Sequence, residues 1–129
     1  MKYPLTSLQG NNNLAFVSVP IRPFSGNTAV GSGTGFFFRP AFGRDFLVTN
    51  RHMVIDEANH FFPDRLGLKL HTDPLDLTKS AEISVPLYRG NGMKESAWEQ
   101  LNNSVDVIAL ELKPEEVRGF VLHAFAPSD

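Results

Sequence analysis

Short apolar runs, broken by glycine, proline and asparagine, recur along most of the chain and have the length of β-strands rather than helices. Apolar and polar positions alternate in residues 66–72 and 81–88, as expected for strands with one buried face. A polar turn lies between these two runs, which predicts a hairpin. The predicted strands are residues 14–21, 34–39, 44–49, 66–72, 81–88 and 105–112.

The run 34–39 is joined to 44–49 by Pro40-Ala41-Phe42-Gly43, which predicts a second hairpin. Single helical turns are expected at 51–54 and at 114–117, where Pro114 suits a helix start. Six strands with short connections favour an all-β fold, a six-stranded antiparallel β-barrel, because closure leaves no free sheet edge. We expect one domain over residues 1–129, with 113–129 as a connector to a further barrel.

The composition is that of an ordinary globular domain, with 42% apolar residues and a formal charge of -2 in 129 residues. No lysine or arginine run is present, which argues against nucleic acid or an anionic membrane as a partner. No segment approaches the roughly 20 apolar residues that span a bilayer. The chain contains no cysteine, so it has no disulfide, thiolate metal site or cysteine nucleophile. Together with the lack of a signal peptide, this favours the cytoplasm.

Three segments carry the residues that suggest chemistry: 33–38, with the pattern Gly-Thr-Gly-Phe, then 46–54 and 105–110. In the second, His52 follows a strand that ends in Val-Thr-Asn. In the third, Asp106 opens the apolar strand Val-Ile-Ala-Leu. This ordered set resembles the N-terminal barrel of trypsin/chymotrypsin-like serine peptidases, particularly the bacterial forms. The resemblance extends over residues 14–112.

The resemblance implies that His52 is a general base and that Asp106, 54 positions later, orients it. An imidazole activates a hydroxyl by taking its proton, and a carboxylate fixes the imidazole tautomer. The third member of the triad belongs to a second barrel, and nothing in this chain matches its glycine-rich loop. Ser32 lies between glycines but precedes the strand leading to His52, so it is not expected to be the nucleophile.

We therefore expect the N-terminal half of a serine endopeptidase, inactive alone and acting on peptides or proteins once a second barrel supplies the nucleophile. The barrel face that would meet that partner should be apolar, which predicts self-association of the isolated chain. The competing hypothesis is a non-catalytic pseudo-peptidase or a peptide-binding barrel. The sequence does not distinguish a serine from a cysteine nucleophile, and it gives no substrate specificity.

No cofactor or metal is predicted. His52, Asp56, Glu57 and His60 do not have the spacing of a standard metal motif, and a solvated loop is the simpler interpretation. The glycine-rich stretch 31–35 precedes a strand rather than a helix, which argues against a phosphate-binding loop. The long turn 53–62 is either a wall of the cleft or a family-specific insertion.

Overall fold

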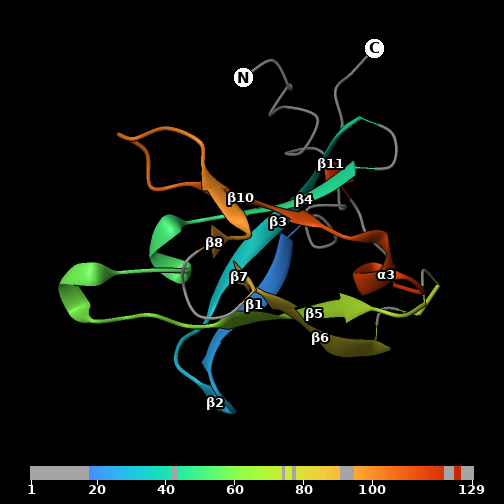
Figure 1. Ribbon diagram of the computed structural model, residues 1–129. Coiled ribbons are helices and arrows are strands. Elements are labelled where there is room, and N and C mark those ends of the chain that lie inside the picture. Colours follow the sequence, from blue (N-terminus) through green and yellow to red (C-terminus); the bar gives the residue numbers. More distant parts are fainter. Residues whose placement is uncertain are drawn as a thin grey trace.

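The computed structural model describes residues 18–41, 44–73, 75–76, 78–90, 95–120 and 124–125. It confirms the all-β class: the described residues form mainly strands, with short helical turns between them (Figure 1). The strands are β1 (Ser18–Ser25), β2 (Thr28–Ala29), β3 (Gly33–Ala41), β4 (Arg44–Thr49), β5 (Arg65–His71), β6 (Ser80–Pro86), β7 (Tyr88–Arg89), β8 (Glu95–Ser96), β9 (Trp98–Gln100), β10 (Ile108–Leu112) and β11 (Ala124–Phe125). The helical turns are η1 (Arg51–Met53), η2 (Glu57–Asn59) and α3 (Pro114–Val117).

Seven strands form one curled antiparallel sheet in the order β6-β5-β1-β3-β4-β10-β9. In Figure 1 the curl of the sheet places β3, β4 and β10 above β1, β5 and β6. Both predicted hairpins are present, as β3–β4 and β5–β6. Among the described residues no ladder joins the two outer strands. They approach at one corner, where the Ala97 N–H, next to β9, donates to the Leu87 carbonyl, next to β6, at 2.9 Å.

The first strand continues beyond the predicted end at Ile21, although Pro20 and Pro23 lie within it. Proline cannot donate to a ladder, so the sequence argues for a turn here. The structure accommodates Pro20 before the pairing with β5 begins at Ile21, and Pro23 after the pairing with β3 ends at the same residue. Each proline therefore lies where one of the two neighbouring ladders is absent. Residues 14–17 of the predicted strand lie outside the described residues.

The core fills the inside of the curl with alternating side chains from several strands. Leu47, Leu66, Leu68 and Ile108 are fully buried, and β10 buries every second residue. Burying one such side chain stabilises the fold by about 1.5–3 kcal/mol. The face of the sheet that forms the core is therefore set by the alternation that the sequence shows.

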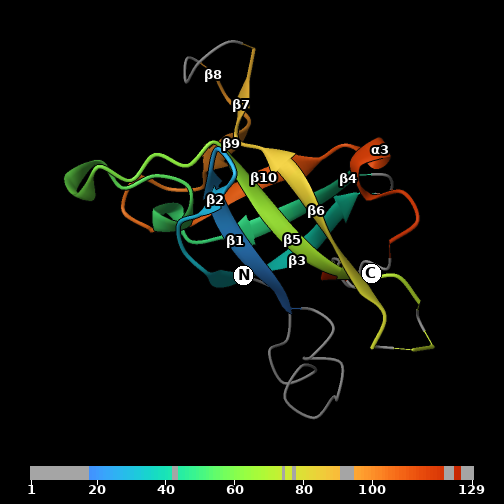
Figure 2. The same cartoon turned by 90° about the horizontal axis from the view of Figure 1, so that it is seen from below.

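Several short elements were not predicted: β2, β7, β8, β9, β11 and η2. Figure 2 shows the β7–β8 hairpin projecting away from the curled sheet. The predicted turn at 114–117 is present as α3, with Val117 buried, and β11 pairs in parallel with β3. Part of the predicted connector 113–129 thus returns to the sheet. No helix in the described part of the chain is long and apolar enough to cross a membrane.

Candidate catalytic dyad

His52 stands where β4 leaves the sheet. The last three residues of β4, Leu47, Val48 and Thr49, are buried, and the chain then turns through η1. Met53 and Val54, directly after the histidine, are buried again. His52 is therefore an exposed side chain between two buried segments, which fixes its backbone while leaving the imidazole accessible.

Two glycines allow the neighbouring strand to lie close to this turn. A Cβ atom on Gly33 would come within 2.8 Å of the Met53 side chain, and one on Gly35 within 2.9 Å of the Val48 carbonyl oxygen. Real Cβ atoms essentially never approach so closely. The contact at Gly35 is with a backbone atom, which cannot easily move, whereas the Met53 side chain near Gly33 can shift; Gly35 is therefore the glycine that the approach of β3 to β4 requires.

A buried hydroxyl closes the end of the same hairpin. Thr34 lies beyond the last β3–β4 pair at this end, Phe36 with Val48. The Thr49 hydroxyl donates to the Thr34 carbonyl at 2.9 Å, and Thr49 is only 6% exposed. The hydrogen bond satisfies a carbonyl that the ladder does not reach, so the strand end before His52 is held by a side chain.

Asp106 lies at the other strand end, just before β10. The ladder between β10 and β4 begins at Ile108, opposite Thr49, so Asp106 falls beside the turn that contains His52. Val105 and the other residues of the loop 101–106 are exposed. The predicted strand 105–112 thus starts three residues late, and this leaves the aspartate in a loop where its carboxylate can turn toward the histidine.

The carboxylate of Asp106 contacts His52 twice. Its Oδ2 atom lies 2.5 Å from the imidazole Nδ1, and its Oδ1 atom accepts the His52 backbone N–H at 3.0 Å. Two oxygens bound to one residue fix the plane of the carboxylate relative to the ring. The structure therefore brings together the two residues that the sequence singled out, 54 positions apart.

The hydrogen bond with the imidazole lowers the pKa of the Asp106 carboxyl below its usual range, an effect that partial burial opposes. Asp106 is therefore ionised at neutral pH, and a carboxylate can only accept, so the hydrogen of this contact belongs to Nδ1 and the Asp106 oxygen accepts it. Both side chains are more than half exposed, at 59% for His52 and 51% for Asp106. Water thus reaches the dyad in this chain.

The backbone of Asp106 is bound as well. Its carbonyl oxygen accepts the Arg51 N–H at 3.2 Å and the side-chain amide of Asn50 at 3.1 Å. Neither contact is predicted by the sequence. The Val-Thr-Asn ending contributes only to the resemblance, and nothing in the sequence indicates that Asn50 faces residue 106.

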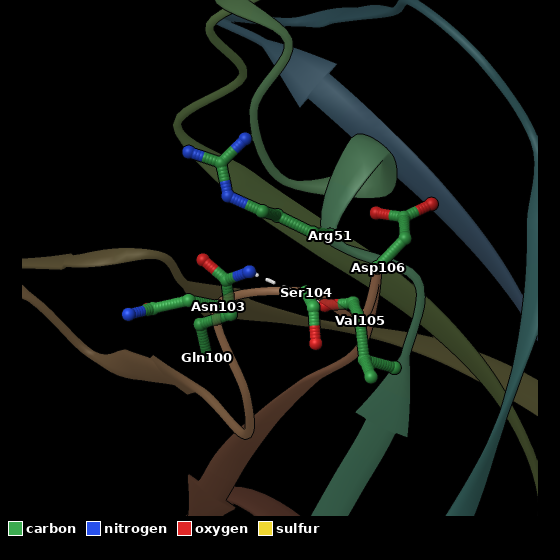
Figure 3. A pocket seen from close by; sticks show the side chains of 6 residues that line it. All are labelled: Arg51, Gln100, Asn103, Ser104, Val105 and Asp106. Carbon is green, nitrogen blue, oxygen red and sulfur yellow. Dashed lines mark hydrogen bonds between the residues drawn. The ribbon is translucent and has the colours of Figure 1, made fainter.

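A polar depression of about 430 Å³ opens beside Asp106 (Figure 3). Arg51, at its edge, forms a two-pronged ion pair with Glu57 of η2, with N···O distances of 3.1 and 2.8 Å. The guanidinium lowers the pKa of Glu57 to about 2. This ion pair links η2, which follows His52 in the chain, to the residue directly before His52. The depression is lined by Arg51, Gln100, Asn103, Ser104, Val105 and Asp106.

Other residues considered from the sequence do not join the dyad. No hydrogen bond links the exposed Ser32 to His52, and in the part of the chain that the structure describes no hydroxyl bonds to the imidazole. Asp56 accepts from Asn59, while His60 adopts a left-handed conformation with φ of 52° at the end of η2. No group of three or more metal-binding side chains occurs among the described residues.

A scan against models of protein families finds no match to this chain. Searches of curated proteins and of solved structures find none either. The functional interpretation therefore depends on the geometry of the site and on the resemblance carried by its motifs.

Proposed function

We propose that this chain provides the histidine and aspartate of a trypsin-like serine endopeptidase whose nucleophile comes from a second barrel. One observation carries the proposal: His52 Nδ1 lies 2.5 Å from Asp106 Oδ2, and the same carboxylate binds the His52 backbone N–H. In a triad, this contact holds the imidazole in the tautomer that accepts a proton at Nε2.

The chemistry would be acyl transfer. Nε2 of His52 takes the proton of the nucleophile, whose oxygen or sulfur forms a bond with the carbonyl carbon of the peptide. The proton then passes to the amine nitrogen as the C–N bond breaks. Water, deprotonated by the same imidazole, then attacks the acyl carbon, which releases the carboxylic acid and returns the proton to the nucleophile. Asp106 keeps its negative charge throughout and stabilises the imidazolium that forms.

The proposal includes a fold: the curled sheet corresponds to the six-stranded N-terminal barrel of these peptidases, closed at the corner where Ala97 meets Leu87. The exposure of the dyad supports the need for a covering partner. Hydrogen bonds between charged groups strengthen when water is excluded, and His52 and Asp106 are more than half exposed here. The chain alone is expected to be inactive, and a cytoplasmic location remains a prediction.

The test uses the natural protein expressed from its full reading frame and a fluorophosphonate probe, which reacts with activated serine nucleophiles. We expect labelling at a residue outside this chain and cleavage of a peptide substrate. Removing the histidine of a triad costs about a millionfold in kcat, and aspartate to asparagine costs about ten-thousandfold. His52→Ala and Asp106→Asn should show losses of this order in peptide turnover.

His60→Asn is the matched control, because it removes a nearby exposed histidine while asparagine tolerates the left-handed backbone at this position. The control should retain activity. Peptide cleavage without labelling, still abolished by His52→Ala, would indicate a cysteine nucleophile. If the protein neither reacts with the probe nor cleaves peptides while known peptidases do both, the proposal fails and the non-catalytic binding module takes its place.

A further inference from the structure

Asp106 is held at four points by three consecutive residues. Its carbonyl oxygen accepts from the Asn50 side chain and the Arg51 N–H, and its carboxylate accepts from the His52 N–H and Nδ1. Of these donors, only Asn50 and His52 use a side chain. The Asn50 amide is thus the one contact, besides the dyad itself, whose presence depends on residue identity.

The hydrogen bond between Asn50 and Asp106 lies beyond the end of the β4–β10 ladder. The last pair of the β4–β10 ladder joins Thr49 to Ile108, two residues away from Asp106. The loop before it is exposed from Leu101 onward, so no buried side chain anchors that side. Asp106 itself is held by its hydrogen bonds to the turn at 50–52, while the residue before it is held by the Gln100 side-chain amide, which donates to the Val105 carbonyl at 3.2 Å.

The Asn50 amide stands 3.1 Å from a carbonyl that already accepts the Arg51 N–H at 3.2 Å. Two donors on one oxygen restrict the rotation of the peptide group of Asp106 more than one donor does. Since the carboxylate is attached to the same Cα, this restriction also limits where Oδ1 and Oδ2 lie. Asn50 is itself exposed, so burial does not explain the choice of asparagine.

We propose that Asn50 is a positioning residue, whose side-chain amide holds the backbone of Asp106 so that the carboxylate stays within reach of His52. Its amide binds the backbone carbonyl of Asp106, while the carboxylate of Asp106 binds His52. The consequence for catalysis depends on the proposed peptidase function, whereas the consequence for the geometry of Asp106 does not.

The test is Asn50→Leu in the natural protein, a change that keeps the size of the side chain and removes the donor. The first measurement is hydrogen exchange at the Arg51 and His52 backbone amides, which both donate to Asp106. Losing one hydrogen bond from the cluster should make these two amides exchange about tenfold faster. Amides within β4 and β10 should be unchanged, which separates local loosening from unfolding.

The second measurement is peptide turnover. A slight misplacement of a catalytic group costs up to about a hundredfold in rate, so kcat should fall about ten- to hundredfold while KM stays constant. Asn59→Leu is the control: it also removes an exposed amide that donates to an acidic residue, Asp56, away from Asp106. The control should change neither quantity.

Equal exchange rates at Arg51 and His52 in Asn50→Leu and Asn59→Leu would overturn the proposal. So would a uniform acceleration that includes the amides of β4 and β10, because Asn50 would then support the fold and not the dyad. A natural protein without peptidase activity would refute the proposed function alone, since the exchange measurement needs no turnover.

Discussion

His52 and Asp106 are carried by two regions that differ in their anchoring. The turn around His52 enters the core on both sides, through Thr49 before it and through Met53 and Val54 after it. The region of Asp106 is packed into the core on one side only, where β10 buries Ile108. On its other side the loop 101–106 is exposed and is held by hydrogen bonds, among them those that the Gln100 side-chain amide donates to the Asn102 and Val105 carbonyls.

The difference shows how a carboxylate without core contacts is brought to a fixed place. Packing against the core holds the turn at 50–52, and this turn holds Asp106 through hydrogen bonds. Side chains in a close-packed core resist displacement, whereas an exposed loop opens at little cost. Core packing therefore fixes the position of His52, and hydrogen bonds from the turn at 50–52 fix the position of Asp106 relative to it.

The largest expected effect tests this asymmetry with one truncation beside each dyad residue. Met53→Ala empties a core position, and methionine to alanine costs about 2–5 kcal/mol of unfolding free energy. Val105→Ala removes an exposed side chain and should change that free energy by less than about 0.5 kcal/mol. Urea denaturation of the two variants measures both values. Similar losses from both would show that the aspartate loop is anchored in the core as firmly as the histidine turn.

A smaller effect is expected from adding one methyl group at the strand contact behind the histidine. Gly35→Ala places a Cβ atom 2.9 Å from the Val48 carbonyl, a backbone atom that cannot easily move. Overpacking of this kind costs about 1–3 kcal/mol. Thr34→Ala, at an exposed position one residue earlier, is the control and should change stability little. Thermal unfolding compares them, and an unaffected Gly35→Ala would mean that β3 does not press on β4.

The smallest expected effect is a pH dependence of stability that comes from the ion pair between Arg51 and Glu57, on the histidine side of the comparison. The pKa of Glu57 is lowered to about 2 in the folded chain, against about 4.3 for an unperturbed glutamate. The ion pair therefore stabilises the fold above about pH 4, and this contribution disappears as the pH falls toward 2. It is small because Glu57 is solvent-exposed.

In Arg51→Gln the pKa of the Glu57 carboxyl should rise from about 2 toward its ordinary value, held back only by the hydrogen bond with its own backbone, and an NMR titration of the side chain measures the shift. The pKa of Asp106 is lowered by His52 in the same direction, so its share of stability is also lost in acid. If the Glu57 midpoint stays near 2 without Arg51, another group sets it and the ion pair does not tie η2 to the turn.

The sequence determined the elements that local patterns encode. Alternation between residues 66 and 88 predicts the β5–β6 hairpin, and the Pro-Ala-Phe-Gly connection predicts β3–β4. The first follows from the period of two that a half-buried strand imposes, and the second from the turn residues between two apolar runs. His52 and Asp106 were predicted from the resemblance of their motifs to trypsin-like peptidases, and the structure places them just after β4 and just before β10.

Only the tertiary structure decided what depends on partners far along the chain. The hydrogen bond from Asn50 to Asp106 spans 56 positions, and the β3–β11 pairing joins residues more than 80 positions apart. Whether a proline ends a strand depended on where the neighbouring ladders begin, which the residues around Pro20 and Pro23 do not encode. Such contacts are fixed by the curl and register of the sheet, and these arise from the packing of all its strands together.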